Sequence, residues 1–139
     1  MAATLGRFPQ SYENVAVREA LVTIASQPSH RHFDALLRAA KSGGLVLDVT
    51  GSQANDTRLR TLESTTGELI LPLFTSLKAL QNAVATTAEG AGTRVRAVIV
   101  SAKEALGYLR SAEFVAVQFD SGAPHSLVVA RSHIEAILG

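Results

Sequence analysis

The chain contains no cysteine and no tryptophan, and it has only two tyrosines and five phenylalanines among its 139 residues. Without cysteine there are no disulfides, no thiolate nucleophiles and no zinc sites with Cys ligands, which suits a reducing compartment. Few aromatic side chains leave little surface on which nucleic-acid bases can stack. The function therefore depends neither on sulfur chemistry nor on base stacking.

The chain also lacks an excess of either charge and lacks long apolar runs. Thirteen basic and twelve acidic residues give a net charge of +1, whereas nucleic-acid backbones require a basic surface, so we expect no nucleic-acid partner. The longest apolar stretches, Leu69 to Phe74 and Ala97 to Val100, are far shorter than the roughly 20 residues that span a bilayer. Residues 1–14 show no signal-peptide pattern. We therefore expect a cytoplasmic protein without membrane association.

What the chain does have is enough apolar content, 47%, to build one core from 139 residues. It shows no internal repeat and no linker. We therefore predict an N-terminal tail over residues 1–14 and one α/β domain over residues 15–139.

Hydrophobic periodicity predicts helices and strands in the order ααβββαβαββα. Strand–helix–strand units in the middle imply parallel crossovers, and hairpins on either side imply antiparallel pairs. The fold class is therefore α/β (mixed α+β), with a single mixed sheet of five or six strands and helices packed on it. The predicted segments are helices around 17–24, 33–40, 77–84, 105–109 and 134–138, and strands 45–49, 59–62, 69–74, 94–100, 114–119 and 126–130.

Polar residues mark where several of these helices begin. Ser29 is placed to cap the second helix, and Ser76, in Thr75-Ser76, to cap the third. Ser101 with Glu104, and Ser132 with Glu135, have the spacing of capping boxes.

Two residues shape the predicted hairpin in the middle of the chain. Gly67 stands where the turn needs a left-handed residue. Pro72 lies inside the following strand and cannot donate a hydrogen bond, so it needs a bulge or a position whose N–H would have no partner.

The segments LPLFTS (71–76), SAKEALGYL (101–109) and the closing FVAVQFDSGAPHSLVVARSHIEAIL (114–138) occur in this order after two helices. In this arrangement residues 15–139 resemble the SseB N-terminal domain family of small bacterial proteins. Relatives often carry a Trp after FTS and an Asn-Pro-Gly turn where this chain has Phe119 to Gly122. The resemblance implies an α/β fold without known catalytic residues, and the family's labels of serine sensitivity and secretion define no biochemical activity.

The nearest approach to a metal cluster is His30, His32 and Asp34. On a helix, residues two apart point about 200° apart, so the two imidazoles diverge. His125 and His133 would join them only if the fold brought the chain ends together. We therefore predict no metal site and no cofactor.

No catalytic motif is present either. There is no G-x-S-x-G elbow to expose a serine, and Ser121-Gly122 is typical of a turn. Gly90-Ala91-Gly92 precedes a strand, the reverse of a dinucleotide-binding loop. We therefore expect a protein that is not an enzyme.

Two groups of residues are candidates for binding. Phe74, Thr75 and Ser76 lie between a strand and a helix, where free N–H groups and the helix dipole can hold an anion. The alternative for Thr75 and Ser76 is simple helix capping, and for Phe74 a place in the core under Leu77 and Leu80, which we favour.

The second group is the two arginine pairs Arg58/Arg60 and Arg94/Arg96, each of which alternation places on one strand face. Four guanidinium groups on one face can hold an acidic partner, although such arginines are more often solvated strand ends.

We expect a non-enzymatic interaction or assembly module that binds a protein partner or itself, possible homodimers included, through exposed sheet edges. The alternative is a sensing domain that binds an anionic metabolite at Thr75-Ser76.

Overall fold

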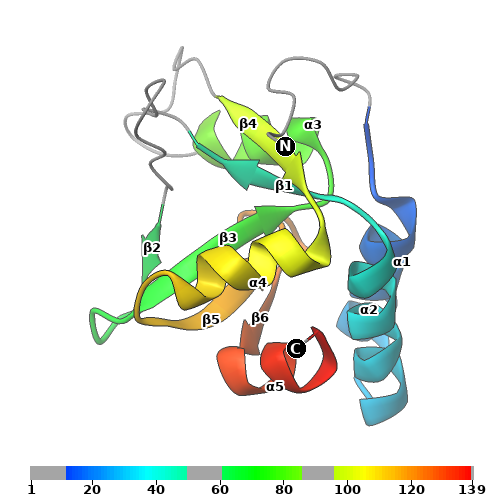
Figure 1. Ribbon diagram of the computed structural model, residues 1–139. Coiled ribbons are helices and arrows are strands. Elements are labelled where there is room, and N and C mark those ends of the chain that lie inside the picture. The colour runs from blue at the N-terminus through cyan, green and yellow to red at the C-terminus, as the bar shows by residue number, and fades with distance from the viewer. Residues whose placement is uncertain (1–11, 50–60, 86–95, 139) are drawn as a thin grey trace.

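A computed structural model describes residues 12–49, 61–85 and 96–138. The mixed α/β class and the predicted order of elements are both confirmed (Figure 1). The elements are α1 (Val15–Ser26), α2 (His30–Ser42), β1 (Leu45–Asp48), β2 (Leu62–Glu63), β3 (Leu69–Phe74), α3 (Leu77–Ala85), β4 (Ala97–Val100), α4 (Ala102–Arg110), β5 (Phe114–Phe119), β6 (Leu127–Ala130) and α5 (Arg131–Leu138).

The strands form one six-stranded mixed sheet in the order β4-β1-β3-β5-β6, with β2 also paired to β3. The β3–β5 pair is parallel, and the other pairs are antiparallel. Because β3 and β5 are parallel neighbours, their carboxyl ends meet at the same edge of the sheet. That edge is where the candidate site lies.

Side-chain alternation along the strands divides the core into two layers. Leu45 and Leu47 of β1 face the larger cluster with α1, α2, α4 and α5, whereas Val46 between them faces the smaller cluster with α3. Figure 1 shows α4 and α3 on opposite sides of the sheet. The reason is topological, because the β3-α3-β4 and β4-α4-β5 crossovers run in opposite directions along the sheet, and crossovers of one hand then place their helices on opposite faces.

Pro72 occupies a position where its missing N–H costs no ladder hydrogen bond. The Leu73 carbonyl accepts the Asp120 N–H at 2.9 Å, so the backbone groups of Leu73 face β5 and those of Pro72 face the opposite side. On that side the described pairing with β1 ends at Leu73 and the pairing with β2 begins at Ile70. Of the two predicted alternatives, the structure has the second, in which Pro72 occupies a position whose N–H would have no strand partner in the described pairing.

Residues 12–14, which we predicted as part of the tail, contact the domain. The hydroxyl of Tyr12 and the amide of Asn14 both donate to the carbonyl of Gly44, at 2.8 and 2.9 Å. A Cβ on Gly44 would lie 2.5 Å from the Ile99 side chain and 2.9 Å from the Tyr12 hydroxyl. Gly44 therefore permits this close approach, and the segment before α1 is attached beside β1.

The helix caps confirm most of the predicted starts. Ser29 accepts the His32 N–H, and Ser101 with Glu104 forms a complete capping box. The predicted box of Ser132 and Glu135 is wrong, because α5 begins at Arg131, directly after β6.

The Glu135 carboxylate instead accepts hydrogen bonds from the Nε atoms of Arg110 and Arg131, both at 2.9 Å. These contacts join α5 to the end of α4. The hydrogen bonds from Arg110 and Arg131 also hold the pKa of Glu135 below its ordinary value of 4.5.

We expect Glu135→Gln to lower the free energy of unfolding more at about pH 6 than at about pH 3. A carboxyl whose pKa is depressed in the folded state stabilises that state above its unfolded pKa, and the contribution disappears as the pH falls through the folded pKa. Urea denaturation of both proteins across this range measures the difference. A gap between wild type and variant that is equal at both ends would contradict the assignment.

Phe74 lies in the core, at 3% exposure, against α3 in the cluster with Val46, Leu77 and Leu80. We expect Phe74→Ala to cost about 3–5 kcal/mol in chemical denaturation, because apolar contacts are lost and a cavity remains. Val22→Ala, at a position 47% exposed on α1, is the control. A loss under about 1 kcal/mol, the size of an ordinary substitution, would show that Phe74 is not needed in the core.

Candidate functional site

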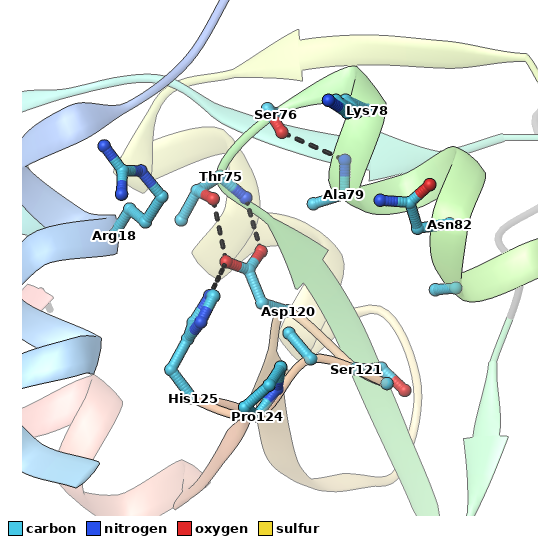
Figure 2. A pocket seen from close by; sticks show the side chains of 13 residues that line it. Arg18, Thr75, Ser76, Lys78, Ala79, Asn82, Asp120, Ser121, Pro124 and His125 are labelled. Carbon is cyan, nitrogen blue, oxygen red and sulfur yellow. Dashed lines mark hydrogen bonds and ion pairs between the residues drawn. The ribbon is translucent and has the colours of Figure 1, made fainter. Parts of the chain in front are cut away.

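The described surface is hollowed at the edge where β3 and β5 end. The hollow has a volume of about 330 Å³ and lies between the start of α3, the Asp120–His125 turn and Arg18 of α1. Figure 2 shows Asp120 below Thr75, with Arg18 on one side and Lys78 and Asn82 of α3 on the other. Ligands of α/β proteins favour such a place, outside the carboxyl ends of parallel strands.

A buried carboxylate organises this edge. Asp120 is 1% exposed. Its Oδ1 accepts the Thr75 N–H at 2.7 Å, and its Oδ2 accepts the Thr75 hydroxyl at 2.8 Å and contacts His125 Nε2 at 2.7 Å. Burial of a charge is costly unless donors satisfy it, and here three donors from two segments do so.

Asp120 has a left-handed backbone conformation at the point where its carboxylate turns toward Thr75. Its φ of +48° makes it the one non-glycine residue of the described chain in the left-handed region. Aspartate tolerates this region better than most residues. The Asp120 N–H still donates to the Leu73 carbonyl, and its own carbonyl accepts the Ala123 N–H at 3.0 Å. The chain thus leaves β5 and turns at once beneath α3.

Thr75 connects the same edge to the N-terminal segment. Its carbonyl accepts the Asn14 N–H at 2.7 Å, while the Asn14 side chain caps α1 by accepting the Val17 N–H at 3.1 Å. Asn14 is itself buried, at 7% exposure. The start of α1, and with it Arg18 one turn later, is therefore positioned by the residue that binds Asp120.

His125 is oriented by the carboxylate that it covers. The Asp120 carboxylate already accepts the Thr75 N–H and hydroxyl, and carboxylate oxygens are hydrogen-bond acceptors. The Nε2 atom of His125 is then the donor in their contact. The side chain of His125 remains 20% exposed in the hollow.

Two cations, Lys78 and Arg18, and the hydroxyl of Ser76 line the hollow. Lys78 lies in the first turn of α3, where Ser76 Oγ accepts the Ala79 N–H at 3.0 Å. Arg18 forms an ion pair with Glu13, but its Nε–H makes no directed hydrogen bond there. The Arg18 side chain is 39% exposed and lines the hollow, although its Nε atom is buried against Glu13.

The order of these groups differs from that of a nucleophilic triad. In a triad the histidine stands between the nucleophile and the acid. Here Asp120 stands between Thr75 and His125, so the threonine hydroxyl donates its hydrogen bond to the carboxylate rather than to the imidazole. The arrangement holds His125 in place.

The model of the SseB protein N-terminal domain family matches residues 17–136, which is most of the chain. The chain belongs to the SseB N-terminal domain family. Comparison with curated proteins and with solved structures finds no match. The resemblance stated from the sequence is thereby confirmed, and it identifies the family without defining an activity.

In this SseB-family domain, the binding candidates predicted from the sequence lie in different places. Thr75 and Ser76 line the hollow, whereas Phe74 is buried in the core. Arg58, Arg60 and Arg94 lie outside the described residues. Arg96 is exposed just before β4 and does not line the hollow.

Sequence reasoning missed Asp120, His125, Arg18 and Lys78. We interpreted Asp120-Ser121-Gly122 as an ordinary turn. The sequence spacing gives no indication that residues 18 and 125 lie close together in space. One usable signal was present, because Thr75 and Asp120 each directly follow an apolar strand. Parallel pairing of those strands would have brought the two residues to one edge.

The histidines that we considered as metal ligands are partly brought together. His30, Asp34 and His133 line one groove beside β6, while the His32 ring contacts the Gln27 carbonyl. Within residues 12–49, 61–85 and 96–138, no group of His, Asp and Glu is arranged to hold a metal ion. Nor does any helix in these ranges have the length and hydropathy needed to cross a bilayer.

We expect Asp120→Asn to lower the free energy of unfolding by about 1.5–3 kcal/mol, the usual value of hydrogen bonds to a charged group. Asn keeps the size and tolerates the left-handed backbone, but its amide nitrogen cannot accept from Thr75. Asp34→Asn on the exposed face of α2 is the matched control. Equal midpoints for the two variants in urea would show that Asp120 does not organise this edge.

Proposed function

We propose that this SseB-family domain binds a small anionic ligand, with a carboxylate or phosphate group, in the hollow at the start of α3. The observation that carries the proposal is the convergence of Arg18, Lys78 and His125 on one concave site. These residues come from α1, α3 and the turn after β5.

Electrostatics favour an anion in this position. The N-terminus of α3 adds the positive end of a helix dipole to the charges of Arg18 and Lys78. The opposing charges are the Glu13 carboxylate, which pairs with Arg18, and the Asp120 carboxylate, which is buried and already accepts three hydrogen bonds. A ligand therefore meets His125, which covers Asp120 and is 20% exposed, rather than the carboxylate itself, and it competes with Glu13 for Arg18.

The size of the hollow favours a metabolite over a polymer. Small-molecule sites usually occupy about 300–1,000 Å³, and this one has about 330 Å³. A ligand with few heavy atoms fits it, and the net charge of +1 provides no extended basic surface for a polyanion.

The proposed role is binding without turnover and without a cofactor. Its support is that Thr75 is buried, at 1% exposure, and that its hydroxyl donates to Asp120 and not to the exposed imidazole of His125. A sensing domain needs only a bound and a free state, and the ligand would join α1, α3 and the Asp120–His125 turn.

This proposal reverses the preference drawn from the sequence, where an interaction or assembly module stood first. The hollow at Thr75 and Ser76 supports the anion-binding alternative more directly than any described surface supports self-association. The interaction role, like the cytoplasmic location, stays a prediction.

Thermal denaturation with inorganic phosphate and with mono-, di- and tricarboxylates tests the proposal. A ligand that binds only the folded state stabilises it by RT ln(1 + L/Kd), where L is the free ligand concentration, so Tm keeps rising with the logarithm of that concentration above Kd. We expect at least one of these anions to raise Tm with this concentration dependence, and Arg18→Ala or Lys78→Ala to weaken binding about tenfold each.

Lys103→Ala, on the exposed surface of α4, is the matched control and should bind as wild type does. If Lys103→Ala weakens binding as much as Lys78→Ala, the anions act through general charge. If no anion in the panel changes Tm, the proposal fails.

A further inference from the structure

A second concave surface lies between α2 and β6, the last strand of the sheet. This groove has a volume of about 510 Å³. Its walls are the first turns of α2 and the strand β6, and it is separate from the anion site, with which it shares no residue. The residues that line it are His30, Phe33, Asp34, Val128, Val129, Ala130 and His133.

Along one wall, β6 presents backbone groups that have no strand partner among the described residues. β6 is the terminal strand of the sheet. The Asp120 N–H points to β3, so by alternation Phe119 and Val117 direct their backbone groups to β6, where their partners are Leu127 and Val129. Val128, between these two partners, therefore directs its N–H and C=O to the free edge. Its side chain is 51% exposed.

The opposite wall and the floor carry an aromatic pair and a carboxylate. The rings of Phe33 and His133 meet edge to face, with centroids 5.4 Å apart. Asp34, one residue along α2, is exposed, and no ion pair or hydrogen bond joins its side chain to any other residue that the structure describes. It is the one carboxylate that lines the groove.

We propose that this groove binds an extended segment of a partner protein, which pairs with the free edge of β6 and places a Lys or Arg side chain beside Asp34. The backbone groups of Val128 provide the strand pairing. The carboxylate of Asp34 and the ring of Phe33 are complementary to a cationic side chain, by charge and by cation–π attraction. The inference does not depend on the anion site.

A second copy of this chain fits the groove less well. The cation next to β6 is Arg131, whose Nε already donates to Glu135 at 2.9 Å and whose Nη1 lies 3.3 Å from the Phe114 carbonyl. A β6–β6 pair would therefore bring no free cation to Asp34. The chemistry of the groove favours a different protein with an unpaired Lys or Arg in an extended segment.

The test uses labelled octapeptides of alternating Thr and Val, with Lys or Glu at one central position, and fluorescence anisotropy. We expect the Lys peptide to bind saturably and about tenfold more tightly than the Glu peptide. Asp34→Asn should weaken the Lys peptide about fivefold and leave the Glu peptide unchanged or slightly tighter. Glu19→Gln, an exposed carboxylate on α1, should change neither.

Strand pairing is tested separately. Val128→Pro removes the N–H that faces the free edge and spares the pairs with β5, so both peptides should lose binding. In the wild type, hydrogen exchange at the Val128 amide should slow when the Lys peptide binds, which provides the same information if the proline variant does not fold.

Three results would overturn the proposal. Equal affinity for the Lys and Glu peptides would show that Asp34 does not select a cationic side chain. Unchanged exchange at Val128 with bound peptide would remove strand pairing. A mass that doubles with concentration, and that Val128→Pro returns to that of the monomer, would show that a second copy occupies the edge instead.

Discussion

The buried carboxylate of Asp120 is the constraint on which the rest of this edge depends. It accepts two hydrogen bonds from Thr75, so the end of β5 is held to the end of β3. Thr75 in turn binds Asn14, which caps α1. A charge placed at 1% exposure must be satisfied completely or the fold loses several kcal/mol. That requirement fixes together three segments that are distant in sequence.

The same constraint explains why the candidate site is open and polar. Asp120 adopts a positive φ, and the chain then turns through residues 121–126 instead of forming a tight hairpin. This longer connection places His125 over the carboxylate and leaves a hollow against α3. The groove at β6 arises differently, because α2 packs on α1, α4 and α5 and leaves the last strand uncovered along one edge.

Much of the fold could be predicted from local sequence because its signals are local. Side-chain alternation predicted that Phe74 lies on the opposite face of β3 from Leu73, under α3. Ser101 with Glu104 predicted the start of α4. The box predicted at Ser132 and Glu135 failed for a tertiary reason, because Glu135 binds Arg110 from another helix and α5 begins earlier. For the site, Thr75 and Ser76 were predicted, since a strand that ends at a helix start is visible in one segment.

The sequence by itself determined the family, the α/β class, the order of elements and the core position of Phe74, because periodicity and capping act within a few residues. Only the tertiary structure decided that Arg18, Thr75, Asp120 and His125 share one edge and that Asp34 and His133 share one groove. The physical reason is that strand order and pairing depend on the burial of apolar side chains from all the helices and strands together. Residues separated by a hundred positions become neighbours only when the sheet forms, and short-range patterns do not determine the order of its strands.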